Sequence, residues 1–331
     1  MTDVSNEAGV SPLAPDGIRP LATDVALLHE QIREGSDPVA PTETPLRLFI
    51  AEFLESRIAA AALAVLVLLV AVALAAPWVT PQNPYDLGAL DILDGRQPPG
   101  AGASAGFTMI LGSDGLGRDL YSAIVYGLRI SLLVGVMSGV LALLIGVCAG
   151  LLAAYAGGRT EALIMRLVDL QLSFPAILVA LMLVAVLGKG VEKIVVALVA
   201  VQWAYYARTV RASALVERRR EYVEAARGLA LSPARIMLRH ILPNCLPPLI
   251  VVVTVQTAHA IALEATLSFL GVGMPPTEPS LGVLIANGFE YMLSGRYWIS
   301  VFPGVALLIT IVSINLVGDQ LREVLNPRLR R

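Results

Sequence analysis

Long charge-free apolar runs constrain the fold of this 331-residue chain more than any other feature. About 20 apolar residues in a helix, rising 1.5 Å each, cross the roughly 30 Å hydrocarbon core of a bilayer. Five runs are clear: Ile58–Val79, Ile130–Gly158, Leu170–Gly188, Ile241–Leu263 and Tyr297–Gly318. A sixth run, at Val191–Ala207, is weaker because Glu192 and Lys193 stand at its start. Only 15% of the residues are charged, against roughly a quarter in soluble domains. We therefore predict an all-α integral membrane protein with six transmembrane helices.

The distribution of Lys and Arg predicts the orientation of these helices. If the N-terminus is inside, the inner segments hold 18 of the 24 Lys and Arg residues. Basic residues accumulate in cytoplasmic loops, so both termini are predicted to be cytoplasmic. The net charge is −2 and the charges are spread along the chain. No basic domain for nucleic acid is expected.

The predicted helices divide the chain into segments. Residues 1–45 carry 8 acidic and 2 basic residues with 6 prolines, too little apolar surface to offset the entropy of ordering. They are predicted to be a disordered acidic cytoplasmic tail. Residues 46–57 are predicted to be an amphipathic lead-in along the membrane surface. The later segments are helix 1 at 58–79, an external segment at 80–129, a core with helices 2–6 at 130–320 and a cytoplasmic C-terminus at 321–331.

The sequence contains no complete motif for catalysis or metal binding. The Gly188-Lys189 pair lacks the GxxxxGK[ST] spacing that wraps phosphates. The letters GASAG at 102–106 lack the strand and helix that a nucleophile elbow requires. The histidines are scattered, without metal-ligand spacing. We predict no catalytic, cofactor or metal site on this chain, and no enzymatic activity of its own.

Four glycines on one face of the second apolar run suggest close helix packing. They are Gly135, Gly139, Gly146 and Gly150. Small residues let helix backbones approach closely in lipid. The face is predicted to serve bundle packing; the alternative is that it slides against a partner during gating.

Polar residues within the apolar runs are candidates for lining a pathway, because polar groups in the membrane are costly. The candidates are Gln256, His259, Glu264 and Asn315. Interhelical hydrogen bonding is the alternative role, and both remain open.

The loop at 221–244 is the long polar stretch in the second half of the chain. Helix-forming residues precede Ser232-Pro233, which predicts an N-cap followed by proline at the first helical position. Two short helices meeting at Leu231–Pro233 are therefore expected. They would expose small and apolar residues, at Ala225, Ala226, Leu229 and Leu231, which favours docking into a groove on another protein. A solvated basic loop near anionic lipid is the alternative.

This loop resembles the EAA loop of ABC-importer permeases. The family pattern is EAA, three residues, Gly, nine residues, an aliphatic residue, any residue, then Leu-Pro. Glu224-Ala225-Ala226 and Leu242-Pro243 stand at the matching positions. The chain departs from the pattern twice: Ala230 occupies the glycine position, with Gly228 two residues earlier, and His240 occupies the aliphatic position.

Further motifs resemble the second permease subunit of the dipeptide/oligopeptide/nickel importer family, over about residues 105–330. They are "LGSDGLGRDLYSAIVYGLRISLLVG" (111–135), "YAGGRTEALIMRLVDLQLSFP" (155–175), "EATLSFLGVGMPP" (264–276) and "LVGDQLREVLNPR" (316–328). The resemblance implies the architecture of a type I ABC importer permease in the bacterial cytoplasmic (inner) membrane. Residues 130–320 would form the permease core and residues 221–244 the cytoplasmic coupling loop.

By the same resemblance, several partners are expected. They are a second homologous permease subunit, two nucleotide-binding ATPase subunits or domains that hold ATP and Mg, an extracytoplasmic substrate-binding protein and the lipid bilayer. The segments Thr80–Tyr121 and Gly271–Trp298 would contact the binding protein, or act only as connectors. The residues expected to dock and couple the ATPases are Glu221, Glu224, Ala225, Ala226, Gly228, Leu229, Ala230, Leu231, Ser232, Pro233, Leu242 and Pro243.

The resemblance implies ATP-driven import of dipeptides or oligopeptides. A nickel complex or glutathione is the alternative cargo within the same family. Outside it, the alternatives are a secondary transporter that works alone and a membrane scaffold. A secondary transporter would need ionisable groups deep in the bundle, and only His259 and Glu264 approach that description.

Overall fold

The computed structural model describes residues 45–86, 88 and 90–325. The acidic tail predicted at 1–45 lies outside these residues except for Pro45, and so do residues 326–331 of the predicted C-terminal segment. Residues from Phe49 onward belong to one compact unit. The packing described below concerns that unit.

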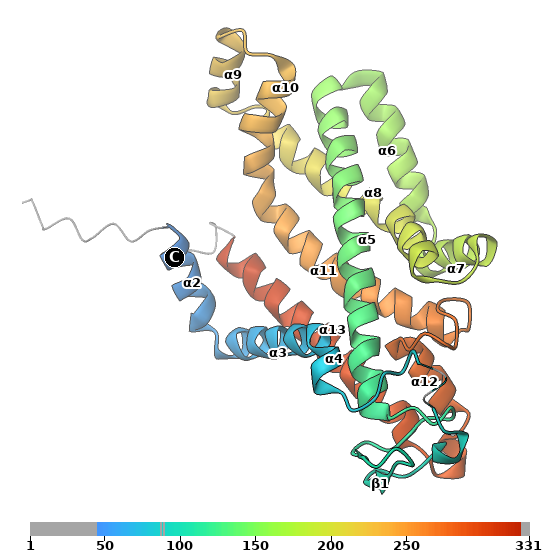
Figure 1. Ribbon diagram of the computed structural model, residues 1–331. Helices are drawn as coiled ribbons and strands as arrows, with labels where there is room; N and C mark the ends of the chain where they lie inside the picture. Colours follow the sequence, from blue (N-terminus) through green and yellow to red (C-terminus); the bar gives the residue numbers. More distant parts are fainter. Residues whose placement is uncertain (1–44, 87, 89, 326–331) are drawn as a thin grey trace, which may run out of the picture. The chain divides into compact units, whose positions relative to one another are not determined.

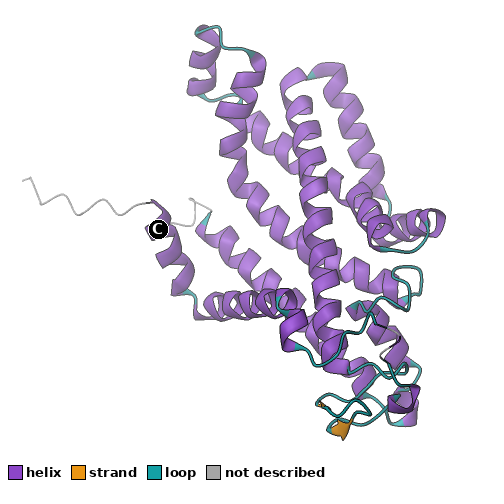
Figure 2. Cartoon of the chain, in the orientation of Figure 1, coloured by secondary structure: helices purple, strands orange, loops and turns teal. Residues whose placement is uncertain are grey.

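Helices dominate the described residues, and a small antiparallel pair of two-residue strands lies between residues 101 and 109 (Figures 1 and 2). The longer helices are α2 (Pro45–Glu55), α3 (Arg57–Leu74), α5 (Leu120–Ala156), α6 (Gly158–Ser173), α7 (Ala176–Leu187), α8 (Val191–Glu217), α9 (Glu221–Gly228), α11 (Leu242–Phe269), α12 (Leu281–Phe289) and α13 (Trp298–Val324). The shorter elements are α4 (Ala76–Val79), η2 (Ile92–Asp94), β1 (Ala101–Gly102), β2 (Thr108–Met109), α10 (Pro233–Arg235), η3 (Ile236–Ile241) and η4 (Met292–Ser294).

Four helical stretches of the described chain are long and apolar enough to cross a membrane: Arg57–Leu74, Leu120–Ala156, Pro233–Phe269 and Trp298–Val324. The pair α6 and α7 would make a fifth, although the two helices are bent by 91°. The helix α8, which carries five charged residues, is not among these stretches.

Two helices begin elsewhere than the apolar runs predict. The Asp119 side chain accepts a hydrogen bond from the Ser122 backbone N–H at 2.8 Å, so this N-cap starts α5 at Leu120 rather than at Ile130. The predicted helix over Leu170–Gly188 is divided between α6 and α7. Pro175 stands at the break, where it disfavours helical backbone in the residue before it.

Glycines allow α5 to approach its neighbours closely. A Cβ added at Gly146 would lie 2.4 Å from the Tyr206 Cβ of α8, and one at Gly150 would lie 2.6 Å from the Ala207 carbonyl oxygen. The earlier pair faces α11: a Cβ at Gly135 would lie 2.7 Å from the Ile261 Cγ1, and one at Gly139 3.3 Å from the Thr257 Oγ1. Each glycine therefore marks a close helix contact; whether the face slides during gating stays a prediction.

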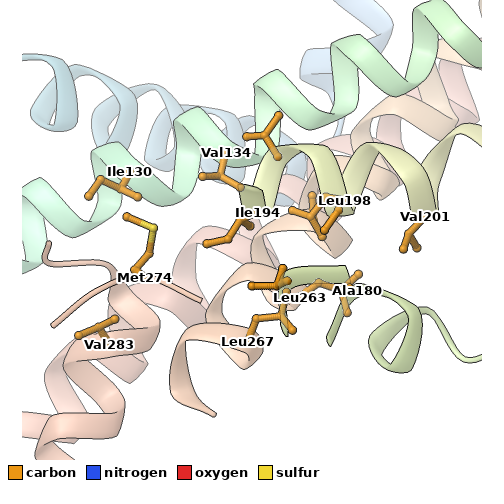
Figure 3. Close-up of a cluster of buried hydrophobic side chains, with 14 residues drawn as sticks. Ile130, Val134, Ala180, Ile194, Leu198, Val201, Leu263, Leu267, Met274 and Val283 are labelled. Atoms are coloured by element: carbon orange, nitrogen blue, oxygen red, sulfur yellow. The ribbon is translucent and has the colours of Figure 1, made fainter. Parts of the chain in front are cut away.

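The largest buried cluster joins α5, α7, α8, α11 and α12 (Figure 3). Ile130 and Val134 of α5 contribute to it, together with Ile194 and Leu198 of α8. Leu263 of α11 belongs to the same cluster. Interdigitated aliphatic side chains of this kind fix the relative positions of helices. The cluster therefore holds α8 and α11 together, and these two helices line the cleft described below.

The α4–α5 segment (residues 80–119) is held by buried polar groups. The Arg118 Nε donates to the Asp114 Oδ2 at 2.7 Å, and the two side chains are 0% and 1% exposed. The Asp94 carboxylate accepts hydrogen bonds from the backbone N–H and the hydroxyl of Ser104. A third link runs from Arg118 to the backbone carbonyl of Pro276 at 3.4 Å. Between Asp94 and Arg118 the segment is therefore cross-linked by polar contacts despite its glycines and prolines.

Candidate functional site: the 221–244 segment and an adjacent cleft

The 221–244 segment contains a short helix, a turn and a second helical stretch. The helix α9 ends at Gly228, and after the turn the chain is helical from Pro233 through η3 into α11. The predicted meeting point at Leu231–Pro233 is therefore observed. The second helix differs from the expectation, because it is not a separate short helix: it continues directly into the long helix α11, as Figure 1 shows.

The inner face of α9 packs against the base of α11. Val223 and Ala226 are buried, and they belong to one cluster with Ile236, Ile241 and Cys245. The expectation that Ala226 is exposed for docking is corrected by its exposure of 4%. Residues three apart lie on one helix face, and this spacing is the signal that could have predicted the buried pair.

The outer face of α9 and the turn remain open to a partner. Leu229 is 75% exposed. Glu221, Glu224, Ala225, Gly228 and Ala230 are also exposed, whereas Leu231 is half-buried against the cluster that contains Ala226. An exposed Leu beside small and acidic residues is a surface suited to a groove on another protein.

The turn after α9 explains why a glycine fits the position of Ala230. The Ala230 backbone has φ +54°, in the left-handed region. The Leu231 N–H donates to the Ala226 carbonyl at 3.2 Å, and the Ala230 N–H donates to the Arg227 carbonyl at 2.9 Å. These two bonds form a Schellman motif, whose left-handed residue is usually glycine. The chain adopts this turn with alanine in its place.

The start of the second helical stretch matches the prediction only in part. Ser232 has extended backbone at the N-cap position and Pro233 follows at the first helical position. The Ser232 side chain makes no capping hydrogen bond. The fixed φ of Pro233 therefore starts this helix without the help of a side-chain cap. Further on, Leu242 is half-buried and Pro243 is exposed.

A chain of polar groups joins α8, α9 and α11 beside this segment. The Tyr222 hydroxyl donates to the Glu217 Oε2 at 2.5 Å. The Asn244 Nδ2 donates to the Tyr222 hydroxyl at 3.1 Å and to the His240 carbonyl at 2.8 Å. We call these four residues the Tyr222 network. Sequence reasoning missed it, because its members lie up to 27 residues apart in the chain.

A cleft lies between α8, α11 and the end of α13. One cavity of about 670 Å³ and a second of about 280 Å³ share the lining residues Thr209, Val251 and Val252. Arg322 and Asn244 line the larger cavity, and Arg208 lines the smaller one. Arg208 also forms an ion pair with Asp169 of α6. Polar side chains on mostly apolar walls make the cleft suitable for a small polar solute.

The four predicted pathway residues do not share one site. Gln256 lines the smaller cavity. Glu264 is fully buried, and its carboxylate accepts hydrogen bonds from the Ser131 hydroxyl at 2.9 Å and the Ser268 hydroxyl at 2.8 Å. The alternative role, hydrogen bonding between helices, therefore describes Glu264. His259 is exposed and Asn315 is half-buried, and among the described residues neither belongs to the lining of these two cavities.

Comparison with known proteins identifies the family of this chain. Residues 146–331, more than half of the chain, match the family described as "Binding-protein-dependent transport system inner membrane component". The chain belongs to this family. Residues 44–99 of this inner membrane component also match the "N-terminal TM domain of oligopeptide transport permease C". The second match includes α3, and the first includes the 221–244 segment and the cleft.

Individual relatives agree over most of their lengths. The inner membrane component is 39% identical to the "Di/tripeptide transport system permease protein DppC" of Pseudomonas aeruginosa, over 89% of this chain and 96% of the relative. It is 38% identical to the "Dipeptide transport system permease protein DppC" of Escherichia coli, over 91% of this chain and 99% of the relative. A solved structure of the MetNI methionine ABC transporter, in an inward-facing conformation, matches 62% of this chain and 98% of its own, with 21% identity and a TM-score of 0.52. This last likeness shows the fold.

Proposed function

We propose that this inner membrane component is a permease subunit of an ATP-driven importer of dipeptides and oligopeptides. In this proposal it spans the membrane six times with both termini in the cytoplasm, and it forms half of the pathway together with a second homologous permease. Two ATPase subunits or domains bind ATP and Mg, and a substrate-binding protein delivers the peptide from outside. The peptide substrate is suggested by the names of the two relatives with 38–39% identity.

The sixth span in this arrangement is α8. Its 27 residues correspond to about 40 Å of helix, enough to cross the hydrocarbon core. Its small residues Ala204 and Ala207 are buried, and the α5 glycines face Tyr206 and Ala207. Residues 194–207 of α8 are free of charge and pack along a spanning helix, and the charged residues lie before and after them, which is compatible with a span.

The observation that carries the proposal is the placement of the exposed face of α9. This helix rests on Ile236 and Ile241, and these residues continue into α11, which lines the cleft. A displacement of α9 by an ATPase would therefore reach the walls of the cleft through one continuous helix. Glu224, Ala225 and Leu229 would meet the ATPase groove, with Glu224 facing a basic group.

The test uses Ala225, because a buried Ala226 cannot separate docking from folding. Ala225→Asp should abolish ATP-dependent uptake of a labelled dipeptide in cells that lack other dipeptide uptake, while the protein is still inserted in the membrane. Ala162→Asp, at an exposed position near the start of α6, is the matched control and should keep uptake. Unchanged uptake by Ala225→Asp would remove α9 from the docking surface.

The partners and the cargo need separate measurements. Purification of the tagged chain in mild detergent, followed by mass spectrometry, should recover a second permease and ATPase subunits. Uptake assays with dipeptide, nickel and glutathione should show transport of the dipeptide. A chain that purifies alone from membranes where the candidate partners are expressed, or uptake that does not need ATP, would favour a self-sufficient transporter.

A further inference from the structure

The base of α11 is built so that it can bend. The Leu242 N–H donates to the Met237 carbonyl, five residues earlier, so η3 is a π-helical turn. Pro243, Pro247 and Pro248 then follow within α11, and each lacks a backbone N–H. Single π-helical turns and prolines both weaken the regular helical ladder, and they are the usual sites of helix bends.

The Tyr222 network lies across this weak region. Asn244, one residue after Pro243, uses its side-chain amide to satisfy the His240 carbonyl of η3. The same amide donates to the Tyr222 hydroxyl of α9, and this hydroxyl donates to Glu217 at the end of α8. Three elements are thus tied together at the point where α11 bends most easily.

Below the network, the apolar contacts of Val223 and Ala226 with Ile236 and Ile241 already hold α9 against η3. The same cluster continues to Ala214 of α8 and Cys245 of α11. Apolar contacts are non-directional, so the polar groups set the orientation of these elements where the π-helical turn and the prolines weaken the helix. Building on the proposed function, we propose that Tyr222 is a positioning residue. Its hydroxyl, through Glu217 and Asn244, transmits movement of α9 into α11.

Two properties of Tyr222 suit this role. Desolvation, and then the hydrogen bond to Glu217, raise the pKa of the Tyr222 phenol to about 12, so the hydroxyl remains a donor at physiological pH. The side chain is 39% exposed, so the network lies at the surface near the docking face of α9. A partner that moves α9 would therefore act on the network directly. The Glu217 Oε1 also lies 3.7 Å from the Nε of Arg220, the residue before α9.

The experiment compares transport with ATP hydrolysis in the whole reconstituted transporter. Tyr222→Phe keeps the ring and removes the hydroxyl. ATP hydrolysis should persist near the wild-type rate, while dipeptide taken up per ATP hydrolysed should fall at least about fivefold, the lower end of typical coupling between sites. Tyr155→Phe removes the hydroxyl of a half-buried tyrosine near the end of α5, whose ring centroid lies 5.8 Å from the Arg218 guanidinium, and it should leave this ratio unchanged.

Two changes at Glu217 test the hydrogen bond itself. Glu217→Gln retains an acceptor for the Tyr222 hydroxyl and should keep most of the coupling, whereas Glu217→Ala should behave like Tyr222→Phe. The proposal is overturned if Tyr222→Phe has the wild-type ratio. It is also overturned if uptake and hydrolysis fall together with thermal stability, because that result would describe a purely structural tyrosine. Absence of ATP-dependent uptake in the wild type would instead contradict the proposed function.

Discussion

The α4–α5 segment and the 221–244 segment are both polar connections, but they hold their shapes in different ways. In the first, Arg118 and Asp114 form a fully buried ion pair. In the second, the hydrogen bonds of Tyr222 and Asn244 join exposed groups. Buried charge pairs fix a conformation because breaking them leaves an unpaired charge in a poorly solvated site. Exposed hydrogen bonds exchange readily with water.

A glycine of α12, the helix that follows the Pro276 contact of Arg118, and a glycine of α9 show a similar difference. At Gly282 of α12, an added Cβ would lie 2.3 Å from the Ala265 backbone carbonyl oxygen of α11, whereas at Gly228 of α9 no atom lies within 4 Å. The helix α12 is thus seated on its neighbour with no spare room, and α9 is not. The comparison suggests that α12 and the α4–α5 segment stay in place, whereas α9 can be displaced by a partner.

The largest effect is expected from breaking the buried ion pair. Arg118→Ala leaves the Asp114 carboxylate buried without its cation, and it should destabilise the fold by about 3–5 kcal/mol. The measurement is the thermal unfolding midpoint of the detergent-purified protein. Arg96→Ala, which removes an exposed guanidinium 5.5 Å from the Tyr291 ring centroid, is the control and should cost at most about 1 kcal/mol. Equal losses would show that the buried ion pair holds the α4–α5 segment no more firmly than an exposed contact does.

A smaller effect is expected at the close contact between α11 and α12. Gly282→Ala forces two backbones apart and should cost about 1–3 kcal/mol, as overpacking of a tight site does. Gly228→Ala adds the same methyl group in open space and should leave the unfolding midpoint unchanged or slightly higher. The midpoints of the two variants, measured in one detergent, test the claim directly. A tolerated Gly282→Ala would contradict the seating of α12.

The smallest effect is expected in the turn after α9. Ala230→Gly removes the left-handed strain of a Cβ-bearing residue, about 1–2 kcal/mol, but adds about 0.5–1 kcal/mol of unfolded-state entropy. The net gain should be about 0.5 kcal/mol, with uptake retained. Ala230→Val, which carries a β-branched side chain at the same φ, should instead be destabilising. A lower midpoint for the glycine variant would show that this backbone is not left-handed.

Of the residues that line the cleft, only one could be predicted from the sequence. Gln256 is a polar residue within an apolar run, and this isolated position was a sufficient signal. Arg208 and Arg322 had no such signal, because each lies in a polar stretch where charges are ordinary. Glu264 gave the same signal as Gln256, yet two serine hydroxyls from α5 and α11 satisfy it within the bundle.

By itself, the sequence determined the properties that are local along the chain. Apolar runs, caps and turn residues predicted the helices, the meeting point near Pro233 and the family pattern around Glu224, because each depends on residues within a few turns of one another. The tertiary structure decided which of these residues face inward. Ala226 is buried and Ala225 exposed only because α9 lies on Ile236 and Ile241. The Tyr222 network likewise depends on how distant segments pack together, and so does the burial of the Arg118–Asp114 pair, whose members are only four residues apart.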